Sequence, residues 1–221
     1  MKFNYTTEMQ VDTLSTGRTY FTPGGAYPSI TTVLGKTANN PWLAQWKARV
    51  GEEEAARVSK EATDRGTLIH SFAERHFNGE SIWEELRAHP LDIRKMTRDL
   101  ISVVEPGVEE IYGQEQILWS NKYRAAGRTD MVGVWKGKPT IIDFKTSKKA
   151  KQATQIRDYF LQCCFYAIAH NELYGTNIRD CVIAITNEVG EPQLFEKSVV
   201  PFLYEFKNRR AEYDRIVQCE Q

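Results

Sequence analysis

Residues 127–151 read GRTDMVGVWKGKPTIIDFKTSKKAK and carry the clearest structural pattern in the chain. Its two halves, residues 127–135 and 140–146, are rich in β-branched and apolar residues, which favour strands. Between them stands Lys136-Gly137-Lys138-Pro139, whose glycine and proline are typical of a turn. The pattern therefore predicts a β-hairpin.

The register of this hairpin follows from the length of its turn. A two-residue turn at Gly137-Lys138, or a four-residue loop over residues 136–139, pairs residues whose numbers sum to 275. Asp130 is then opposite Lys145, and Asp143 shares their face because side chains alternate along a strand. Opposed side chains lie about 5 Å apart and diagonal ones roughly 7–8 Å, within reach of one shared ion. A three-residue turn would place Asp130 on the other face.

Two carboxylates and a lysine on one face suit the hydrolysis of a phosphodiester. Asp130 and Asp143 offer the oxygen ligands that Mg²⁺ or Mn²⁺ prefers. Lys145 can orient the attacking water or stabilise the charge of the transition state. An isolated Asp-x-Lys triplet is usually an ordinary surface strand. The preceding Gly-Arg-Thr-Asp, the apolar pair Ile141-Ile142 and the shared face favour the catalytic interpretation here.

The hairpin resembles the PD-(D/E)xK nuclease superfamily in its RecB-like branch, and two further segments agree with that branch. They are Gly66-Thr67-Leu68-Ile69-His70 with Glu74, and Gln162-x-x-x-Tyr166. The nearest resemblance is to the mitochondrial genome maintenance exonuclease family and its phage and bacterial relatives. Pro28-Ser29-Ile30-Thr31, Trp42 with Trp46, and Asp143-Phe144-Lys145-Thr146-Ser147 resemble that family, and the likeness extends over residues 27–175.

The resemblance implies roles for individual residues. His70, Asp130, Asp143 and the backbone carbonyl of Phe144 would ligate the metal, and Glu74 stands one helical turn from His70. A lone helical histidine is more often structural, and Glu74 could simply form a salt bridge. Gln162 and Tyr166, four residues apart, would help to hold the nucleic acid. The other nucleic-acid-binding candidates are Arg128, Ser147, Lys148 and Lys149.

Charge and cysteine content exclude several classes of protein. The formal net charge is zero, so basic residues gather only locally, beside the hairpin, where they suit a rim that tracks phosphates. The cysteines at positions 163, 164, 181 and 219 lack C-x-x-C spacing, and none precedes Cys163, which argues against a zinc cage and an iron–sulfur cluster. Gly35-Lys36-Thr37 lacks the earlier glycine of a phosphate-binding loop, so no ATP site is expected.

No signal peptide, transit peptide or long apolar run is evident in the sequence. We therefore expect a cytoplasmic protein, in a bacterial cell or a phage-infected host, with no membrane partner and no obligate protein partner. The cysteine usage suits the same reducing compartment. The expected ligand is single-stranded DNA.

The remaining pattern alternates helices and strands. Residues 2–24 are expected to be extended. Three helices should follow: one from Ser29 to residue 34, one from Asn40-Pro41 to about residue 60, and one from Thr63 or Asp64 to residue 78. A short helix is then expected after a capping box at Ser81–Glu84, and another over residues 91–104. Strands at 114–120, 127–135 and 140–146 are followed by a helix at 150–174 that ends at Gly175, strands at 181–186 and 193–199, and a helix from Pro201.

This order predicts an α/β fold, which the resemblance specifies as a restriction-endonuclease-like core with a central mixed sheet flanked by helices. We expect one nuclease domain over residues 1–221, with a mainly helical layer in residues 1–110 and the catalytic sheet in 111–221. The expected activity is a Mg²⁺- or Mn²⁺-dependent exonuclease on single-stranded DNA, in replication, recombination or repair. The alternatives are a structure-specific endonuclease or flap nuclease, and a non-catalytic single-strand-binding accessory protein.

Overall fold

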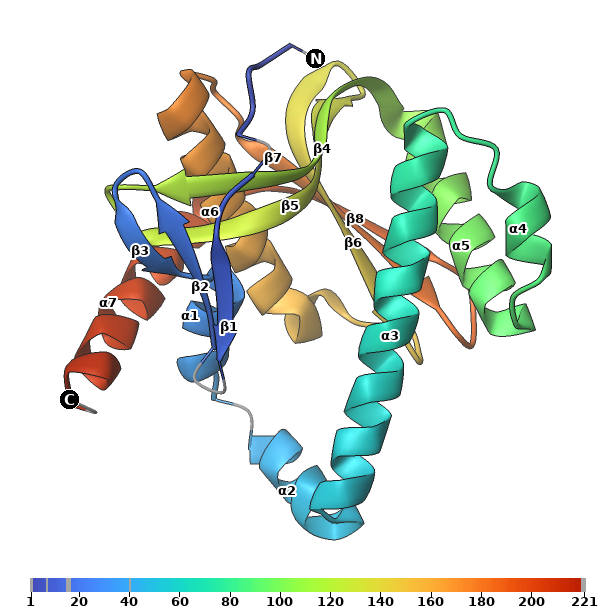
Figure 1. Ribbon diagram of the computed structural model, residues 1–221, viewed down its shortest axis with the longest axis horizontal. Helices are drawn as coiled ribbons and strands as arrows, with labels where there is room; N and C mark the ends of the chain where they lie inside the picture. The colour runs from blue at the N-terminus through green and yellow to red at the C-terminus, as the bar shows by residue number, and fades with distance from the viewer. Residues whose placement is uncertain (1, 7, 15–16, 40, 220–221) are drawn as a thin grey trace.

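The central sheet has five strands in the order β4-β5-β6-β7-β8. The computed structural model, drawn in Figure 1, describes residues 2–6, 8–14, 17–39 and 41–219. Neighbouring strands are antiparallel except β6 and β7, which are parallel and joined by the crossover helix α6. The strands are β4 (Val108–Ser120), β5 (Ala125–Trp135), β6 (Lys138–Ser147), β7 (Asp180–Asn187) and β8 (Gln193–Ser198). This mixed sheet confirms the predicted fold class.

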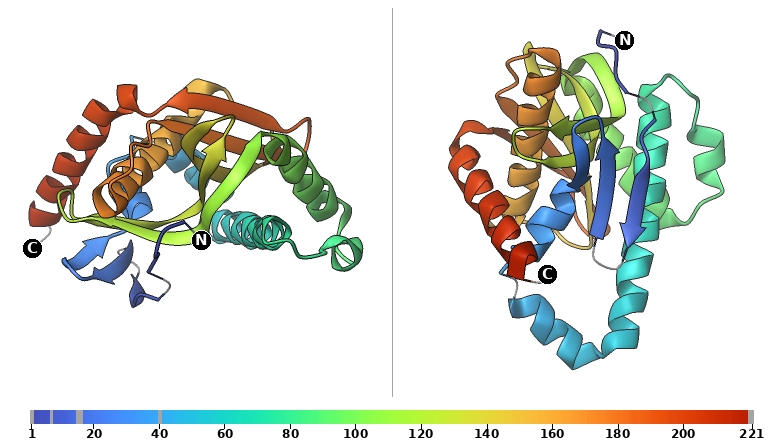
Figure 2. Two further views of the ribbon diagram at one scale, coloured as in Figure 1. Left: turned by 90° about the horizontal axis from the view of Figure 1, so that it is seen from above. Right: turned by 60° about the vertical axis from the view of Figure 1, so that its left-hand side comes forward.

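Helices cover both faces of the sheet, because apolar side chains alternate between its two sides and form a core on each. On one face Val132, Ile141 and Ile183 pack under α1 (Ile30–Lys36), α6 (Arg157–Tyr174) and α7 (Leu203–Cys219). Figure 2 shows these helices and those of the opposite face on either side of the strands. Among the described residues, no helix is both long and apolar enough to traverse a lipid bilayer.

The opposite face carries the second core, in which Met131, Ile142 and Phe144 are buried. Its helices are α3 (Glu52–Phe77), α4 (Trp83–Arg87) and α5 (Leu91–Val104). Short 3₁₀ turns complete the chain at η1 (Glu105–Gly107), η2 (Ala153–Ile156) and η3 (Val200–Phe202). The long α3 projects beyond the sheet, and most of its first three turns are exposed.

A second, three-stranded sheet lies near the N-terminus, where the sequence suggested only an extended segment before a helical layer. Its antiparallel strands are β1 (Val11–Leu14), β2 (Gly17–Thr22) and β3 (Gly25–Pro28). Tyr20 and Tyr27 are buried against Ile117 and Trp119 of β4. The extended segment expected at residues 2–24 thus contains strands of a sheet, while helices predominate from Ile30 to Val104. The three strands are short, and they are ordered by packing on the main sheet.

Several helix boundaries differ from the prediction. The expected helix from 40 to 60 breaks at Gly51, whose φ of 88° separates α2 (Pro41–Val50) from α3. Position 40, the expected cap, lies outside the described residues. Helix α3 continues through Thr63 and Asp64, because the Thr63 hydroxyl donates to the Ser59 carbonyl and Asp64 pairs with Lys60, both one turn earlier in the same helix. Ser81 does not cap α4, whose N-cap is Ile82, and α6 begins at Arg157 after η2.

Other predicted ends are confirmed. Ser29 caps α1 by accepting a hydrogen bond from the Thr32 backbone N–H at 3.0 Å. Helix α6 ends at Gly175, which adopts the left-handed conformation with φ 65°. The start of one strand differs, however: the strand expected at 114–120 ends as predicted at Ser120 but begins six residues earlier, at Val108.

The register of the β5–β6 hairpin differs by two from the predicted one. Trp135 pairs with Lys138 and Met131 with Ile142, so the paired numbers sum to 273. The turn is Lys136-Gly137, where both residues have positive φ (46° and 79°), as a type I′ turn requires. Lys145 is therefore not opposite Asp130; Asp143 occupies that level instead. Because the shift is even, both aspartates keep the same side of their strands.

Strands β5 and β6 separate beyond the Met131–Ile142 pair, at a point that we call the fork. In Figure 1, β5 runs with β4 to one side while β6 continues beside β7. Residues 125–130 of β5 keep only β4 as a ladder partner, apart from a bridge between Ala126 and Ser29. The fork places backbone groups of two strands beside Asp130 and Asp143.

Candidate active site

Three side chains that can bind a metal converge from three elements at the fork. His70 of α3, Glu115 of β4 and Asp130 of β5 each place a ligand atom within 4.8 Å of the other two. Nδ1 of His70 lies 3.4 Å from Oδ1 of Asp130. Within the described residues, no other group of three or more histidine, cysteine or acidic side chains meets this condition. We call these residues the metal-ligand trio.

The trio lines a cleft of about 400 Å³ between α3 and the two sheets. Glu74 adds a further carboxylate from α3, as the helical spacing from His70 predicted. Arg18 of β2 and Arg128 of β5 bring positive charge to the same cleft. An acidic centre with guanidinium groups at its edge can hold both a cation and the phosphates of a nucleic acid.

Helix α3 can approach β6 because Gly66 has no side chain. A Cβ at Gly66 would lie 3.2 Å from Oγ1 of Thr146, closer than side chains usually pack. His70 follows one turn later on the same helical face, and its ring meets the edge of the Phe144 ring at a centroid distance of 5.9 Å. The Gly66-x-x-x-His70 spacing thus positions the imidazole over the fork.

Glu115 is the member of the trio that the sequence analysis missed. Its neighbours Gln114 and Gln116 pair with Met131 and Thr129, so Glu115 lies level with Asp130 across the β4–β5 ladder. Its φ of 52° is unusual for a residue with a side chain. The available signal was the polar triplet Gln114-Glu115-Gln116, which directly precedes the apolar run Ile117-Leu118-Trp119 in the same strand.

The pKa values of the two carboxyls in the trio shift in opposite directions. Burial raises the pKa of Glu115 to about 7, and the negative charges of Asp130 and Glu74 add to the effect, while Arg128 at 3.8 Å opposes it. Burial would also raise the pKa of Asp130, but the charge and hydrogen bond of His70, with Lys145, bring it below its usual range. Such a pair of carboxyls would be stabilised by a bound cation.

Asp130 also anchors the edge of β6 at the fork. The backbone N–H of Phe144 donates a hydrogen bond of 2.6 Å to Oδ2 of Asp130, replacing a ladder bond that β5 no longer supplies. His70, Asp130 and Phe144, all expected at the site, are therefore brought together. The structure shows the amide of Phe144 in this contact, whereas the sequence analysis assigned its carbonyl to the metal.

Asp143 and Lys145 form a buried ion pair beside the trio, and the Lys145 ammonium contacts Oδ2 of Asp143. Burial raises the pKa of Asp143 to about 6, because the lysine charge only partly offsets desolvation. Burial would lower the pKa of Lys145, but the charges of Asp143 and Asp130 raise it above its ordinary value. Both expected residues are thus close to the trio without belonging to it.

Gln162 and Tyr166 lie beneath β5, a placement that differs from the expected contact with nucleic acid. Tyr166 is only 2% exposed. Its hydroxyl donates a hydrogen bond of 2.7 Å to the backbone carbonyl of Arg128 and accepts one of 3.0 Å from the amide of Gln162. The side chain of Gln162 is half-buried. The tyrosine therefore contacts a strand of the protein.

Ser147, Lys148 and Lys149 lie where β6 ends. The Ser147 hydroxyl donates to the backbone carbonyl of Lys149 at 2.7 Å, and both lysines are exposed. They stand outside the residues that line the cleft, whereas Arg128, predicted with them, lies inside it. Arg18 was missed because nothing in the N-terminal segment indicated that β2 would reach the site.

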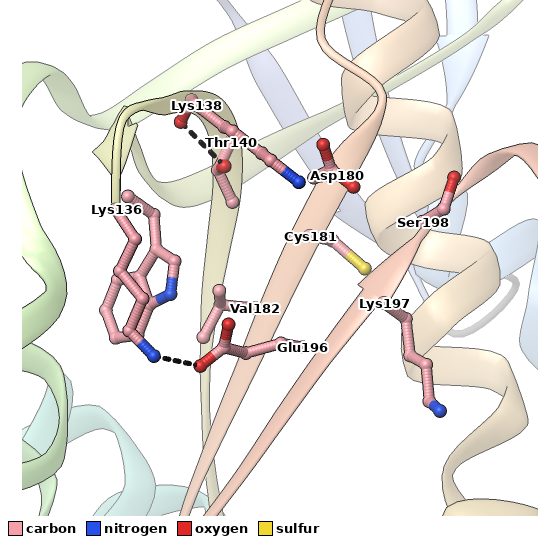
Figure 3. A pocket seen from close by; sticks show the side chains of 10 residues that line it. Lys136, Lys138, Thr140, Asp180, Cys181, Val182, Glu196, Lys197 and Ser198 are labelled. Carbon is pink, nitrogen blue, oxygen red and sulfur yellow. Dashed lines mark hydrogen bonds and ion pairs between the residues drawn. The ribbon is translucent and has the colours of Figure 1, made fainter.

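A second concavity, of about 320 Å³, lies at the other end of β5 and β6 (Figure 3). Trp135, Lys138 and Asp180 are among its lining residues, and Lys136 pairs with Glu196 across it at 2.6 Å. Trp135 is five residues from Asp130, which corresponds to about 17 Å along a strand. The metal-ligand trio and this concavity are thus at opposite ends of the hairpin.

Comparison with known proteins identifies a family. Residues 41–217 match the sequence model of the PD-(D/E)XK nuclease superfamily. No curated protein sequence matches the chain. Among solved structures, a candidate exonuclease of Eubacterium rectale is 12% identical with a TM-score of 0.45, over 71% of this chain and 69% of that one. The protein SSO0001 is 19% identical with a TM-score of 0.30, over 79% and 82%. Similarities this distant add nothing to the assignment.

Proposed function

Because the chain belongs to the PD-(D/E)XK nuclease superfamily and is therefore a metal-dependent nuclease, we propose that it digests single-stranded DNA from a free end. Such an activity serves replication, recombination or repair. We also propose that the protein works in the cytoplasm, because its four cysteines are free thiols and free thiols suit a reducing compartment.

The observation that carries the proposal is the metal-ligand trio in a cleft edged by arginines. Two carboxylates and an imidazole with ligand atoms within 4.8 Å of one another fit one divalent cation. We assign Mg²⁺ or Mn²⁺, held by His70, Glu115 and Asp130, with Asp143 and the Phe144 carbonyl as further ligands.

When bound, a divalent cation would neutralise charge on the phosphate and make a nearby water more acidic. Lys145 would orient the attacking water and stabilise negative charge on the phosphate in the transition state, since it is a buried cation at the fork. Asp143 would hold the ammonium in place. Asp143 is buried and Lys145 is mostly buried, so solvent screens their charges only weakly and their effect on the reaction is stronger.

The nucleic acid would be gripped by its backbone. Arg18 and Arg128 at the cleft offer bidentate contacts to phosphates, and Lys148 and Lys149 extend the basic rim. Arg18 comes from the N-terminal sheet and His70 from α3, so the DNA strand would pass between this sheet and this helix. In Figure 1, α2 lies at the lower end of α3, on the side toward α1. This arrangement supports threading of a free end.

The test is digestion of one 60-nucleotide sequence supplied as a 5′-labelled strand, a 3′-labelled strand and a closed circle, with Mg²⁺, Mn²⁺ or chelator. We expect the linear strands to be degraded and the circle to survive, because a closed circle offers no end to thread. Chelator should stop all cleavage. Asp130→Asn, which removes a proposed ligand, serves as the inactive control.

Each alternative has its own outcome in this assay. Cutting of the circle at the rate of the linear strand would contradict threading and favour a structure-specific endonuclease. Binding of both substrates without any cleavage, in either metal, would favour the non-catalytic single-strand-binding protein.

A further inference from the structure

The fork leaves part of β5 without a hydrogen-bonding neighbour on one side. Its ladder with β6 stops at Met131, so the backbone groups of residues 125–130 that face away from β4 need other partners. At the carbonyl of Arg128 a side chain, and not a strand, supplies a hydrogen bond. This carbonyl lies two residues before Asp130, so whatever binds it influences where the Asp130 carboxylate is held.

Tyr166 of α6 binds this carbonyl. Its hydroxyl donates to the Arg128 oxygen at 2.7 Å and accepts from Nε2 of Gln162 at 3.0 Å, so both of its hydrogen-bonding roles are used inside the protein. The ring is buried and sits against Gly127: a Cβ at Gly127 would be 2.9 Å from the ring and 3.1 Å from the hydroxyl. Glycine at this position is what lets the tyrosine reach the strand.

We propose that Tyr166 is a positioning residue, which holds β5 at the fork so that Asp130 meets His70 and Glu115, and that Gln162 fixes the orientation of its hydroxyl. The inference rests on the proposed function of Asp130 as a metal ligand. It assigns Gln162-x-x-x-Tyr166 to the geometry of the metal site and not to contact with DNA.

Two side chains thus replace the missing ladder at the fork. Oδ2 of Asp130 receives the N–H of Phe144 on the β6 side, and Tyr166 binds the carbonyl of Arg128 on the β5 side. Loss of the tyrosine hydroxyl would remove the hydrogen bond that the Arg128 carbonyl accepts from α6 and would allow β5 to shift. Because catalysis depends on sub-ångström placement of the metal ligands, a small shift of Asp130 would lower the turnover rate.

The experiment compares Tyr166→Phe with the wild type in two assays. Steady-state cleavage of a single-stranded oligonucleotide should show a kcat roughly tenfold lower with KM for DNA unchanged. Calorimetric titration with Mn²⁺ in the absence of DNA should show affinity weakened by about threefold or more. Tyr174→Phe on the same helix is the matched control; it also removes a tyrosine hydroxyl, remote from the fork, and should leave kcat and Mn²⁺ affinity as in the wild type.

Gln162→Ala provides a second variant that keeps the aromatic ring, and we expect a smaller change in the same direction. A raised KM with normal kcat and normal Mn²⁺ affinity in both variants would overturn the inference and indicate contact with DNA. Asp130→Asn tests metal ligation by Asp130 separately from positioning by Tyr166. If it binds Mn²⁺ like the wild type, the ligand assignment has failed; if it loses Mn²⁺ while Tyr166→Phe behaves as wild type, only the positioning role has failed.

Discussion

Lys145 and its lysine neighbours differ in surroundings, although they stand close together in the sequence. Lys145 is mostly buried and contacts the Asp143 carboxylate, whereas Lys148 and Lys149 are exposed beyond the end of β6. A buried cation can stabilise charge in the transition state, while exposed lysines attract phosphates from a distance. We therefore expect Lys145 to act in the chemical step and Lys148 and Lys149 to act in binding.

For Lys145→Ala we expect kcat to fall by about 10²- to 10³-fold with little change in DNA affinity. The double variant Lys148→Ala with Lys149→Ala should instead weaken DNA binding and reduce its salt dependence, by up to about two in the slope of log K against log salt. Cleavage kinetics and fluorescence anisotropy at several salt concentrations measure both effects. A thermal melt of each variant checks folding, and the reverse pattern would remove the distinction between the lysines.

At the scale of the element, the turn of the β5–β6 hairpin sets which residues meet at the fork. Gly137 has φ 79°, and a side chain there is strained whatever space surrounds it. Gly35 in helix α1 has no atom within 4 Å of an added Cβ and no unusual φ. The backbone conformation therefore favours glycine at position 137, whereas the surroundings of position 35 leave room for a side chain.

Gly137→Ala should lower the free energy of unfolding by about 1 kcal/mol, because alanine resists the left-handed conformation. Gly35→Ala should raise it by roughly 0.5–1 kcal/mol, because alanine restricts the unfolded chain and favours the helix. Urea unfolding followed by circular dichroism measures both. Equal changes of one sign would show that the type I′ geometry does not constrain this hairpin.

At the scale of the whole molecule, the N-terminal segment is joined to the core through His170. Nε2 of this buried histidine is 2.9 Å from the hydroxyl of Tyr5, and Nδ1 is 2.8 Å from Oγ1 of Thr176. The threonine hydroxyl donates to Asn171, so it accepts from Nδ1–H, and Nε2 accepts from Tyr5. This neutral arrangement cannot take a second proton without losing the tyrosine bond.

Burial lowers the pKa of His170 to about 4, so stability should fall in acid. Below about pH 6.5 the unfolded chain binds a proton that the folded chain does not, and the loss is complete only below about pH 4. It amounts to at most roughly 3 kcal/mol. We expect His170→Gln to be less stable than the wild type at pH 7 and to approach it at pH 4.5, as measured by urea unfolding. Parallel pH curves would contradict this assignment.

The hydrophobic pattern determined much of the molecule locally. The abundance of β-branched and apolar residues in 127–135 and 140–146 specified β5 and β6, and Ser29 and Gly175 specified helix ends, because such signals depend on neighbours in the chain. The motif residues His70, Asp130, Asp143 and Lys145 were likewise named from the sequence, and the structure places them around one fork. Spacing along β6 was enough to put Asp143 and Lys145 on one side of that strand, because side chains alternate along a strand.

Only the tertiary structure decided the features that depend on segments distant in sequence. The three-stranded sheet that brings Arg18 to the cleft is ordered by packing on β4 and β5, and Glu115 meets Asp130 only across the β4–β5 ladder. The hairpin register depended on whether Lys136 would accept a positive φ, which its side chain does not reveal. Tyr166 stood in the sequence as a candidate for DNA contact, and its burial against Gly127 became visible only once α6 lay beneath β5. Contacts across long sequence separations arise from the packing of whole elements, so local periodicity could not supply them.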